Sequence, residues 1–213
     1  MSKSDFTLMA CDVQMFCETR LMNYDTENTN SYQIQDYHNV FFEGYSARNI
    51  RSSYVLEFYT KYHILKSYQA AVMVEKTSNF STECAVINVR LSSNTSLNIS
   101  SINMRPNTPL LDFKSALFNV LALSKRHRPA TDSNLQKFDL LMGDFNMDWV
   151  EQSTQNFMKE LLPGYKKLIH ESTTDYGSTL DHFYTNIPIE LIQCVVTESD
   201  YTDHQPVICM INL

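Results

Sequence analysis

The feature that most constrains the fold of this chain is an apolar run that ends in polar residues, at positions 138–146. The run Phe-Asp-Leu-Leu-Met is typical of a buried β-strand, and Gly143 follows it directly. Asp144 and Asn146 then stand two positions apart, and alternation along an extended chain would put both side chains on one side. A buried strand with a polar end predicts a sheet-based fold with its functional site at strand ends.

A second polar pair lies near the C-terminus. Asp203 and His204 precede an apolar run over 207–211 that predicts the last strand. Carboxylate oxygens bind hard cations such as Mg²⁺, and an imidazole can stabilise the negative charge that develops during a reaction. Together with Asp144 and Asn146, these residue types suit metal-assisted attack of water on a phosphate ester.

The spacing of apolar residues predicts an α/β fold. The chain of 213 residues has the size of one domain, and no linker or repeat divides it, so we expect a single domain over 1–213. Apolar residues at helical spacing predict helices over 113–124 and 154–162. Mixed strands with a few helices predict two packed sheets flanked by helices. The expected strands are 13–17, 40–42, 54–59, 70–74, 84–91, 97–104, 138–142, 180–184 and 207–211.

The composition narrows the class of protein. A net charge of −7 disfavours broad nucleic-acid binding through Lys and Arg, but carboxylates that hold a divalent ion bind phosphate through the metal. We interpret the basic stretches 125–128 and 166–167 as solvated. No apolar run is long enough to cross a membrane, and the N-terminus has no signal-peptide pattern. The five cysteines include no C-x-x-C pair, so we expect reduced, buried thiols in an intracellular protein.

Five places in chain order carry a resemblance to a known family. They are Glu18 after the first strand, Asn107 after Arg105-Pro106, Asp144 with Asn146, Asp181 within 178–182, and Asp203 with His204. In these residues the chain resembles the endonuclease/exonuclease/phosphatase superfamily. The segment 174–186 is most similar to the endonuclease domains of mobile genetic elements, such as helitrons and non-LTR retroelements. The resemblance covers nearly the whole chain.

The resemblance implies a fold and an activity. The fold would be a four-layer α/β sandwich of the DNase I type. The activity would be Mg²⁺-dependent hydrolysis of phosphodiesters in DNA, with Mn²⁺ as an alternative ion. A protein of this kind would work in the nucleus, without a membrane partner. A helicase or reverse-transcriptase domain of the parent element would be its neighbour.

The resemblance also implies a role for most of these residues. Glu18 and Asp203 would bind the metal, and Asp144 would position or deprotonate the attacking water. Asn146 would orient phosphate or water, and Asn107 would belong to the same catalytic set. Taken alone, Glu18 is better explained as an exposed carboxylate at a strand end, and Asn107 can be explained as a turn former.

His204 would face the scissile phosphate and stabilise its charge, while the carboxylate of Asp181 holds the imidazole in place. His204 also has an ordinary explanation as a turn residue. We interpret His182 as a surface residue that does not belong to the motif, and Trp149 as a packing anchor. The joint occurrence of the polar residues, in order and ahead of apolar strands, favours the site.

The chain departs from the family pattern in three places. Family members begin with a strand that carries a metal-binding Asn, and the 12 residues before Val13 supply none, so we expect an N-terminally truncated domain. Met104 stands where the family has Tyr, and Ser52-Ser53 replace a Gly-rich strand start. Two hypotheses follow: an active endonuclease, and a catalytically impaired relic or interaction domain that keeps the fold. A phospholipid or inositol phosphate substrate is disfavoured, because the chain lacks the extra basic or lipid-facing elements of those relatives.

Overall fold

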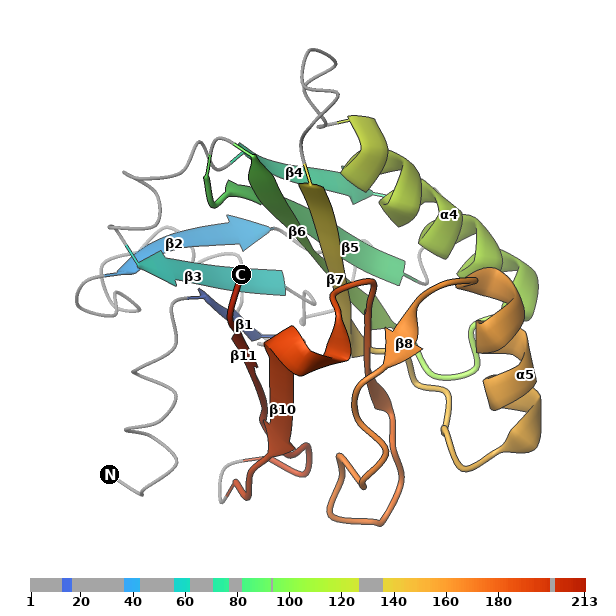
Figure 1. The fold of residues 1–213 in the computed structure, drawn as a ribbon. Helices are drawn as coiled ribbons and strands as arrows, with labels where there is room; N and C mark the ends of the chain where they lie inside the picture. Colours follow the sequence, from blue (N-terminus) through green and yellow to red (C-terminus); the bar gives the residue numbers. More distant parts are fainter. Residues whose placement is uncertain are drawn as a thin grey trace.

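Two layers of β-strands pack together in the computed structural model, with helices on the outside of one of them (Figure 1). The structure describes residues 13–16, 37–42, 56–61, 71–76, 82–92, 94–126, 136–199 and 202–213. Glu18 and Cys17 lie outside these residues. The sequence prediction of two packed sheets with helices is confirmed for the described part of the chain.

The larger sheet has six strands in the order β4-β5-β6-β7-β9-β8. Its strands are β4 (Ala71–Lys76), β5 (Thr82–Arg90), β6 (Thr95–Met104), β7 (Gln136–Asp144), β8 (Lys166–Lys167) and β9 (Asp181–Thr185). β6 and β7 are parallel, and all other neighbours in this sheet are antiparallel. The helix α4 (Leu110–Arg126) lies between β6 and β7 in the chain, as the crossover that a parallel pair requires.

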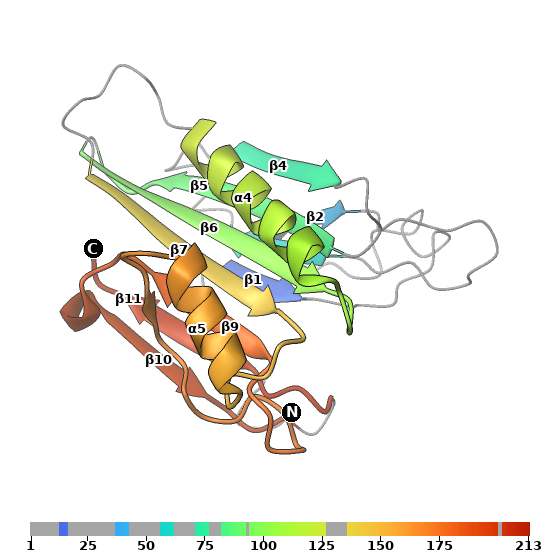
Figure 2. The same ribbon diagram turned by 90° about the vertical axis from the view of Figure 1, so that its right-hand side faces the viewer.

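Both described α-helices cover the same face of the six-stranded sheet (Figure 2). In α4 the residues Phe113, Leu117 and Val120 are buried, which is the helical spacing that the sequence predicts. The second helix, α5 (Gln152–Leu161), buries Met158 and Leu161 against the same core as α4. Both helices therefore close the same side of the sheet.

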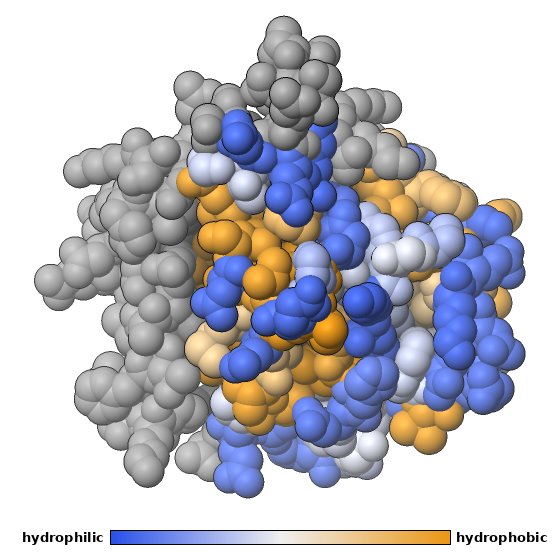
Figure 3. Space-filling view, viewed as in Figure 1, coloured by the Kyte–Doolittle hydropathy of each residue, from blue (hydrophilic) through white to orange (hydrophobic). Residues whose placement is uncertain are grey.

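The opposite face of the six-stranded sheet packs against the second layer of strands. That layer contains β1 (Val13–Phe16), β2 (Tyr37–Phe42) and β3 (Leu56–Lys61) in the order β1-β3-β2, and the antiparallel pair β10 (Ile192–Val196) and β11 (Val207–Ile211), which follow the short 3-10 helix η2 (Ile189–Leu191). Ile99, Leu140 and Phe183 of the larger sheet are buried in one cluster against this layer. The outer side of β10 and β11 carries exposed apolar residues, including Val195 and Met210 (Figure 3).

One prediction about the cysteines is wrong. Cys194 on β10 and Cys209 on β11 are directly opposite each other in the strand register and form a disulfide, whereas the sequence predicts reduced thiols. Cys84 is buried, as expected. No helix within the described residues is long and apolar enough to span a membrane.

Candidate active site

Two carboxylates meet where β7 ends and β9 begins. Asp144 is the last residue of β7 and Asp181 the first of β9, and the antiparallel register places them directly opposite each other. Directly opposite residues point to the same face of a sheet. Asp144 is only 6% exposed, so its carboxylate is held inside the protein rather than in solvent.

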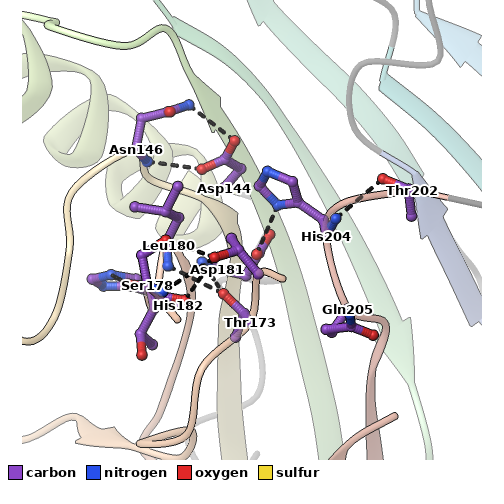
Figure 4. Close-up of polar contacts among 12 residues, drawn as sticks. Asp144, Asn146, Thr173, Ser178, Leu180, Asp181, His182, Thr202, His204 and Gln205 are labelled. Carbon is purple, nitrogen blue, oxygen red and sulfur yellow. Dashed lines mark hydrogen bonds and ion pairs between the residues drawn. The ribbon is translucent and has the colours of Figure 1, made fainter. Parts of the chain in front are cut away.

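Asn146 fixes the position of Asp144. Its backbone N–H donates to Asp144 Oδ1 at 2.8 Å and its side-chain Nδ2 donates to Asp144 Oδ2 at 2.9 Å (Figure 4). Nδ2 also donates to the carbonyl of Met104 at the end of β6. Asn146 has φ 47, in the left-handed region that Asn tolerates better than most residues. The side chains of Asp144 and Asn146 therefore meet because the chain turns back after β7. Strand alternation, from which their meeting is predicted, is not the cause.

His204 is bound to Asp181. Its Nδ1 lies 2.9 Å from Asp181 Oδ2, and Figure 4 shows the ring beside Asp144. This hydrogen bond raises the pKa of His204 to about 9, and the charges of Asp144 and Asp203 act in the same direction, while partial burial opposes them. The imidazole is therefore a cation at neutral pH, and no hydrogen bond within the described residues involves its Nε2.

A buried threonine connects the two segments that carry this pair. Thr173 Oγ1 accepts hydrogen bonds from the backbone N–H of Leu180 at 3.1 Å and of Asp181 at 3.0 Å. The carbonyl of Thr173 accepts the N–H of Gln205 at 2.8 Å. Thr174 and His204 also pair through an isolated antiparallel β-bridge. The position of His204 against Asp181 is thus set by backbone contacts, before the side chains meet.

Two of the predicted residues stand apart from this cluster. Asp203 is exposed; its charge acts on His204, and its backbone carbonyl accepts the N–H of Asp175 at 3.0 Å. Asn107 is exposed in the turn after β6 with φ 61, which fits its explanation as a turn former. No hydrogen bond in the described part of the chain joins its side chain to the cluster. Glu18 lies outside the described residues.

Sequence reasoning missed Asn103 and Ser101. Both lie on β6 and are buried, and within the described part of the chain neither Asn103 Oδ1 nor Ser101 Oγ has a hydrogen-bond partner. β6 pairs in parallel with β7, with Ser101 opposite Met142, so the same register places Asn103 level with Asp144 on the same face. A buried acceptor without a donor is costly unless a ligand or water completes it. In the sequence, the only sign of this position was that Ser101 and Asn103 are polar residues within the predicted strand 97–104.

The interpretation of His182 as a surface residue is wrong. Its side chain is fully buried and stacks on Phe145 with ring centroids 4.9 Å apart. Burial, together with the charge of Lys167, lowers the pKa of His182 to about 3, so the ring is neutral. Its Nε2 lies 2.8 Å from the carbonyl of Met147. Trp149 packs edge-on against His182, which confirms its role as a packing anchor.

The ammonium nitrogen of Lys167 is also buried, although the basic stretch 166–167 predicts solvated side chains. It lies over the ring of Trp149 at 4.7 Å and over that of Tyr184 at 5.6 Å, and no hydrogen-bond acceptor for it is found among the described residues. Burial lowers the pKa of Lys167 from 10.5 to about 7, and the charge of Asp181 opposes this shift only in part. The charged form of Lys167 is therefore disfavoured in the folded protein.

We expect Lys167→Met to raise the free energy of unfolding by about 1–3 kcal/mol at pH 6, because an apolar side chain replaces a buried charge without a partner. The folded-state pKa lies below the unfolded one, so the parent binds fewer protons than its unfolded chain between pH 7 and 10.5 and gains stability as the pH rises. The advantage of the variant should therefore shrink over this range. Urea unfolding at pH 6, 8 and 9.5 measures it, with Lys166→Met on the exposed neighbour as the control. A variant less stable than the parent at pH 6 would show that the contact with Trp149 outweighs the cost of burial.

The predicted metal ligands are not brought together within the described residues. There, no group of three or more His, Cys, Asp or Glu side chains is arranged to hold an ion. Carboxylate oxygens are ligands that a hard cation prefers, and the charges of Asp144, Asp181 and Asp203 all act on the imidazole of His204. The buried Oδ1 of Asn103 adds an oxygen that lacks a donor. The residues present thus fit a divalent cation, for which Glu18 remains a predicted ligand.

The fold matches solved structures, although no protein-family model and no curated protein matches the sequence. An endonuclease/exonuclease/phosphatase family protein from Leptotrichia buccalis C-1013-b is 16% identical, with a TM-score of 0.59 over 100% of this chain and 96% of that one. The AP endonuclease LMAP from Leishmania major is 13% identical, with a TM-score of 0.66 over 98% and 81%. ANGEL2, a 2',3'-cyclic phosphatase, is 12% identical, with a TM-score of 0.66 over 99% and 85%. The chain therefore has the endonuclease/exonuclease/phosphatase fold, as the sequence resemblance predicts.

Proposed function

We propose that this chain is a metal-dependent phosphodiester hydrolase that acts on DNA. The observation that carries the proposal is the pair of polar units at the ends of β7 and β9. One unit is Asp144 held by Asn146, and the other is His204 held by Asp181 at 2.9 Å. A fixed carboxylate and a fixed imidazolium side by side can act on a water and on a phosphate oxygen at the same time.

In this proposal Asp144 orients the attacking water and accepts its proton. Asn146 uses its Nδ2 for Asp144 and Met104, so its Oδ1 is the atom left to orient the water. The imidazolium of His204 faces the phosphate and stabilises the negative charge that develops there. Asp181 is a positioning residue, because it acts through the ring that it holds.

We propose Mg²⁺, or Mn²⁺, as the cofactor, held by Asp203 together with Glu18. Two kinds of support are the excess of carboxylates around His204 and the residue pattern of the superfamily. When bound, the ion supplies positive charge for the phosphate and lowers the pKa of coordinated water. The role of Glu18 rests on the sequence resemblance alone.

The DNA substrate and a mobile-element origin are also proposals. An AP endonuclease is among the solved structures with this fold, which supports DNA. The residues 174–186 support the origin, and a helicase or reverse-transcriptase neighbour would follow from it. The contrasting hypothesis is an impaired relic or interaction domain, and the absence of a three-ligand group within the described residues favours it.

Nicking of supercoiled plasmid DNA tests the proposal. The purified chain is incubated with Mg²⁺, Mn²⁺, Ca²⁺ or EDTA, and bis(p-nitrophenyl) phosphate serves as a small phosphodiester. We expect nicking and ester hydrolysis with Mg²⁺ or Mn²⁺ and neither with EDTA. Asp144→Asn, prepared in parallel, excludes a contaminating nuclease, because it should be inactive while it remains folded. A folded protein that hydrolyses neither substrate with any ion would favour the relic hypothesis.

A further inference from the structure

An exposed aromatic residue lies two positions after Thr174, whose backbone pairs with that of His204. Tyr176 is 83% exposed, the largest exposed fraction among the large apolar side chains of the described residues. Its ring makes no contact with another ring there. Exposed tyrosines are common, so the argument depends on how the protein presents this one.

The loop that carries Tyr176 is held in one shape by its own hydrogen bonds. The N–H of Gly177 donates to the carbonyl of Thr174 at 3.2 Å, and Gly177 has φ 86, a conformation that favours glycine. Thr174 Oγ1 lies 2.7 Å from Ser178 Oγ, and the N–H of Thr173 donates to the Ser178 carbonyl at 2.9 Å. A loop ordered in this way presents its aromatic side chain without a large entropic cost on binding.

The same loop is attached to the segment that carries His204. Thr174 forms a backbone bridge to His204, and the N–H of Asp175 donates to the carbonyl of Asp203 at 3.0 Å. The side chain of Asp175 accepts a hydrogen bond from Gln205. Tyr176 is the next residue, so its position relative to the imidazole is set by backbone contacts on both sides.

We infer that Tyr176 stacks on an unpaired nucleobase next to the phosphodiester at His204. This inference rests on the proposed function and names the part of the substrate that this loop recognises. The net charge of −7 leaves little general attraction for the DNA backbone. An aromatic face binds a base without needing positive charge, and every base offers a flat surface for it. Because bases in a duplex are already stacked, the contact favours single-stranded or unpaired DNA.

Binding and turnover of a labelled single-stranded oligonucleotide test the inference. Tyr176→Ala should weaken binding, measured by fluorescence anisotropy in EDTA, roughly 5- to 100-fold. Tyr176→Phe should bind as the parent does, because stacking needs the ring and not the hydroxyl. Phe118→Ala removes another exposed aromatic residue, on α4, and serves as the control that should change nothing.

Three results would overturn the inference: unchanged oligonucleotide binding in Tyr176→Ala, equal losses in Tyr176→Phe and Tyr176→Ala, or an equal loss on a fully paired duplex. The loss should also persist at high salt, because stacking releases no counterions. Anisotropy in EDTA needs no hydrolysis, so its result is independent of whether the chain proves to be an enzyme. Hydrolysis of the small phosphodiester by the parent protein tests the proposed function separately.

Discussion

Replacement of His204 by alanine is expected to lower the rate of metal-dependent phosphodiester hydrolysis about 10²–10³-fold while the protein stays folded. The imidazole of His204 is hydrogen-bonded to Asp181 and is charged at neutral pH, so its loss removes the charge that would face the phosphate. The side chain is partly exposed and lies outside both apolar cores, so little packing is lost. Plasmid nicking and thermal melting measure the two effects.

His170→Ala is the matched control, because His170 is an exposed histidine outside the cluster. It should keep the activity of the parent protein. If His204→Ala also stays within a few-fold of the parent, then His204 has no catalytic role and the assignment is wrong.

Asp181→Asn separates positioning from charge. The hydrogen bond from His204 to Asp181 is the largest cause of its raised pKa, so the variant should lower the pKa of the imidazole toward its ordinary 6.5. In the parent, the folded-state pKa lies above the unfolded one, so the pair stabilises the fold fully below about pH 6.5 and loses this effect as the pH rises through about 9. NMR titration of the imidazole in EDTA reports the shift directly.

Gly143→Ala is expected to have the largest effect on stability, a loss of about 3–5 kcal/mol in the free energy of unfolding. An added Cβ would stand 1.9 Å from the carbonyl oxygen of Ile102, which belongs to the neighbouring strand β6. The φ of +136 is also a conformation that side chains rarely adopt. Relief requires β6 and β7 to separate, and Ile102 is fully buried between sheet and helix.

Gly164→Ala isolates the cost of the close approach. Gly164 has φ +85 but nothing within 4 Å of an added Cβ, so the substitution should cost only about 1 kcal/mol. Urea unfolding of both variants gives the comparison. Equal losses in the two variants would mean that backbone conformation alone, and not the contact with β6, decides the role of Gly143.

The sequence by itself determined the elements whose pattern is local. Apolar spacing predicted α4 and α5 and the strand β7 to within a few residues at each end, because one face of each helix is buried and the strand is apolar. The resemblance added the order of the polar motifs, and the structure does bring Asp144, Asn146, Asp181 and His204 together. The strand β8 was not predicted, since two residues carry no pattern of their own. The strand β10 was also not predicted, although its sequence is mostly apolar.

Only the tertiary structure decided which polar side chains are buried, how their pKa values shift and which cysteines pair. His182 and Lys167 have polar side chains that usually face solvent. The ring of His182 and the ammonium nitrogen of Lys167 are nevertheless buried, because the rings of Trp149 and Tyr184 pack against them. The disulfide between Cys194 and Cys209 depends on strand register, which cysteine spacing does not reveal. The local sequence determines which residues alternate along a strand or recur at helical spacing. Burial, pKa and pairing across strands arise from distant segments that close over one another, so they exist only in the folded chain.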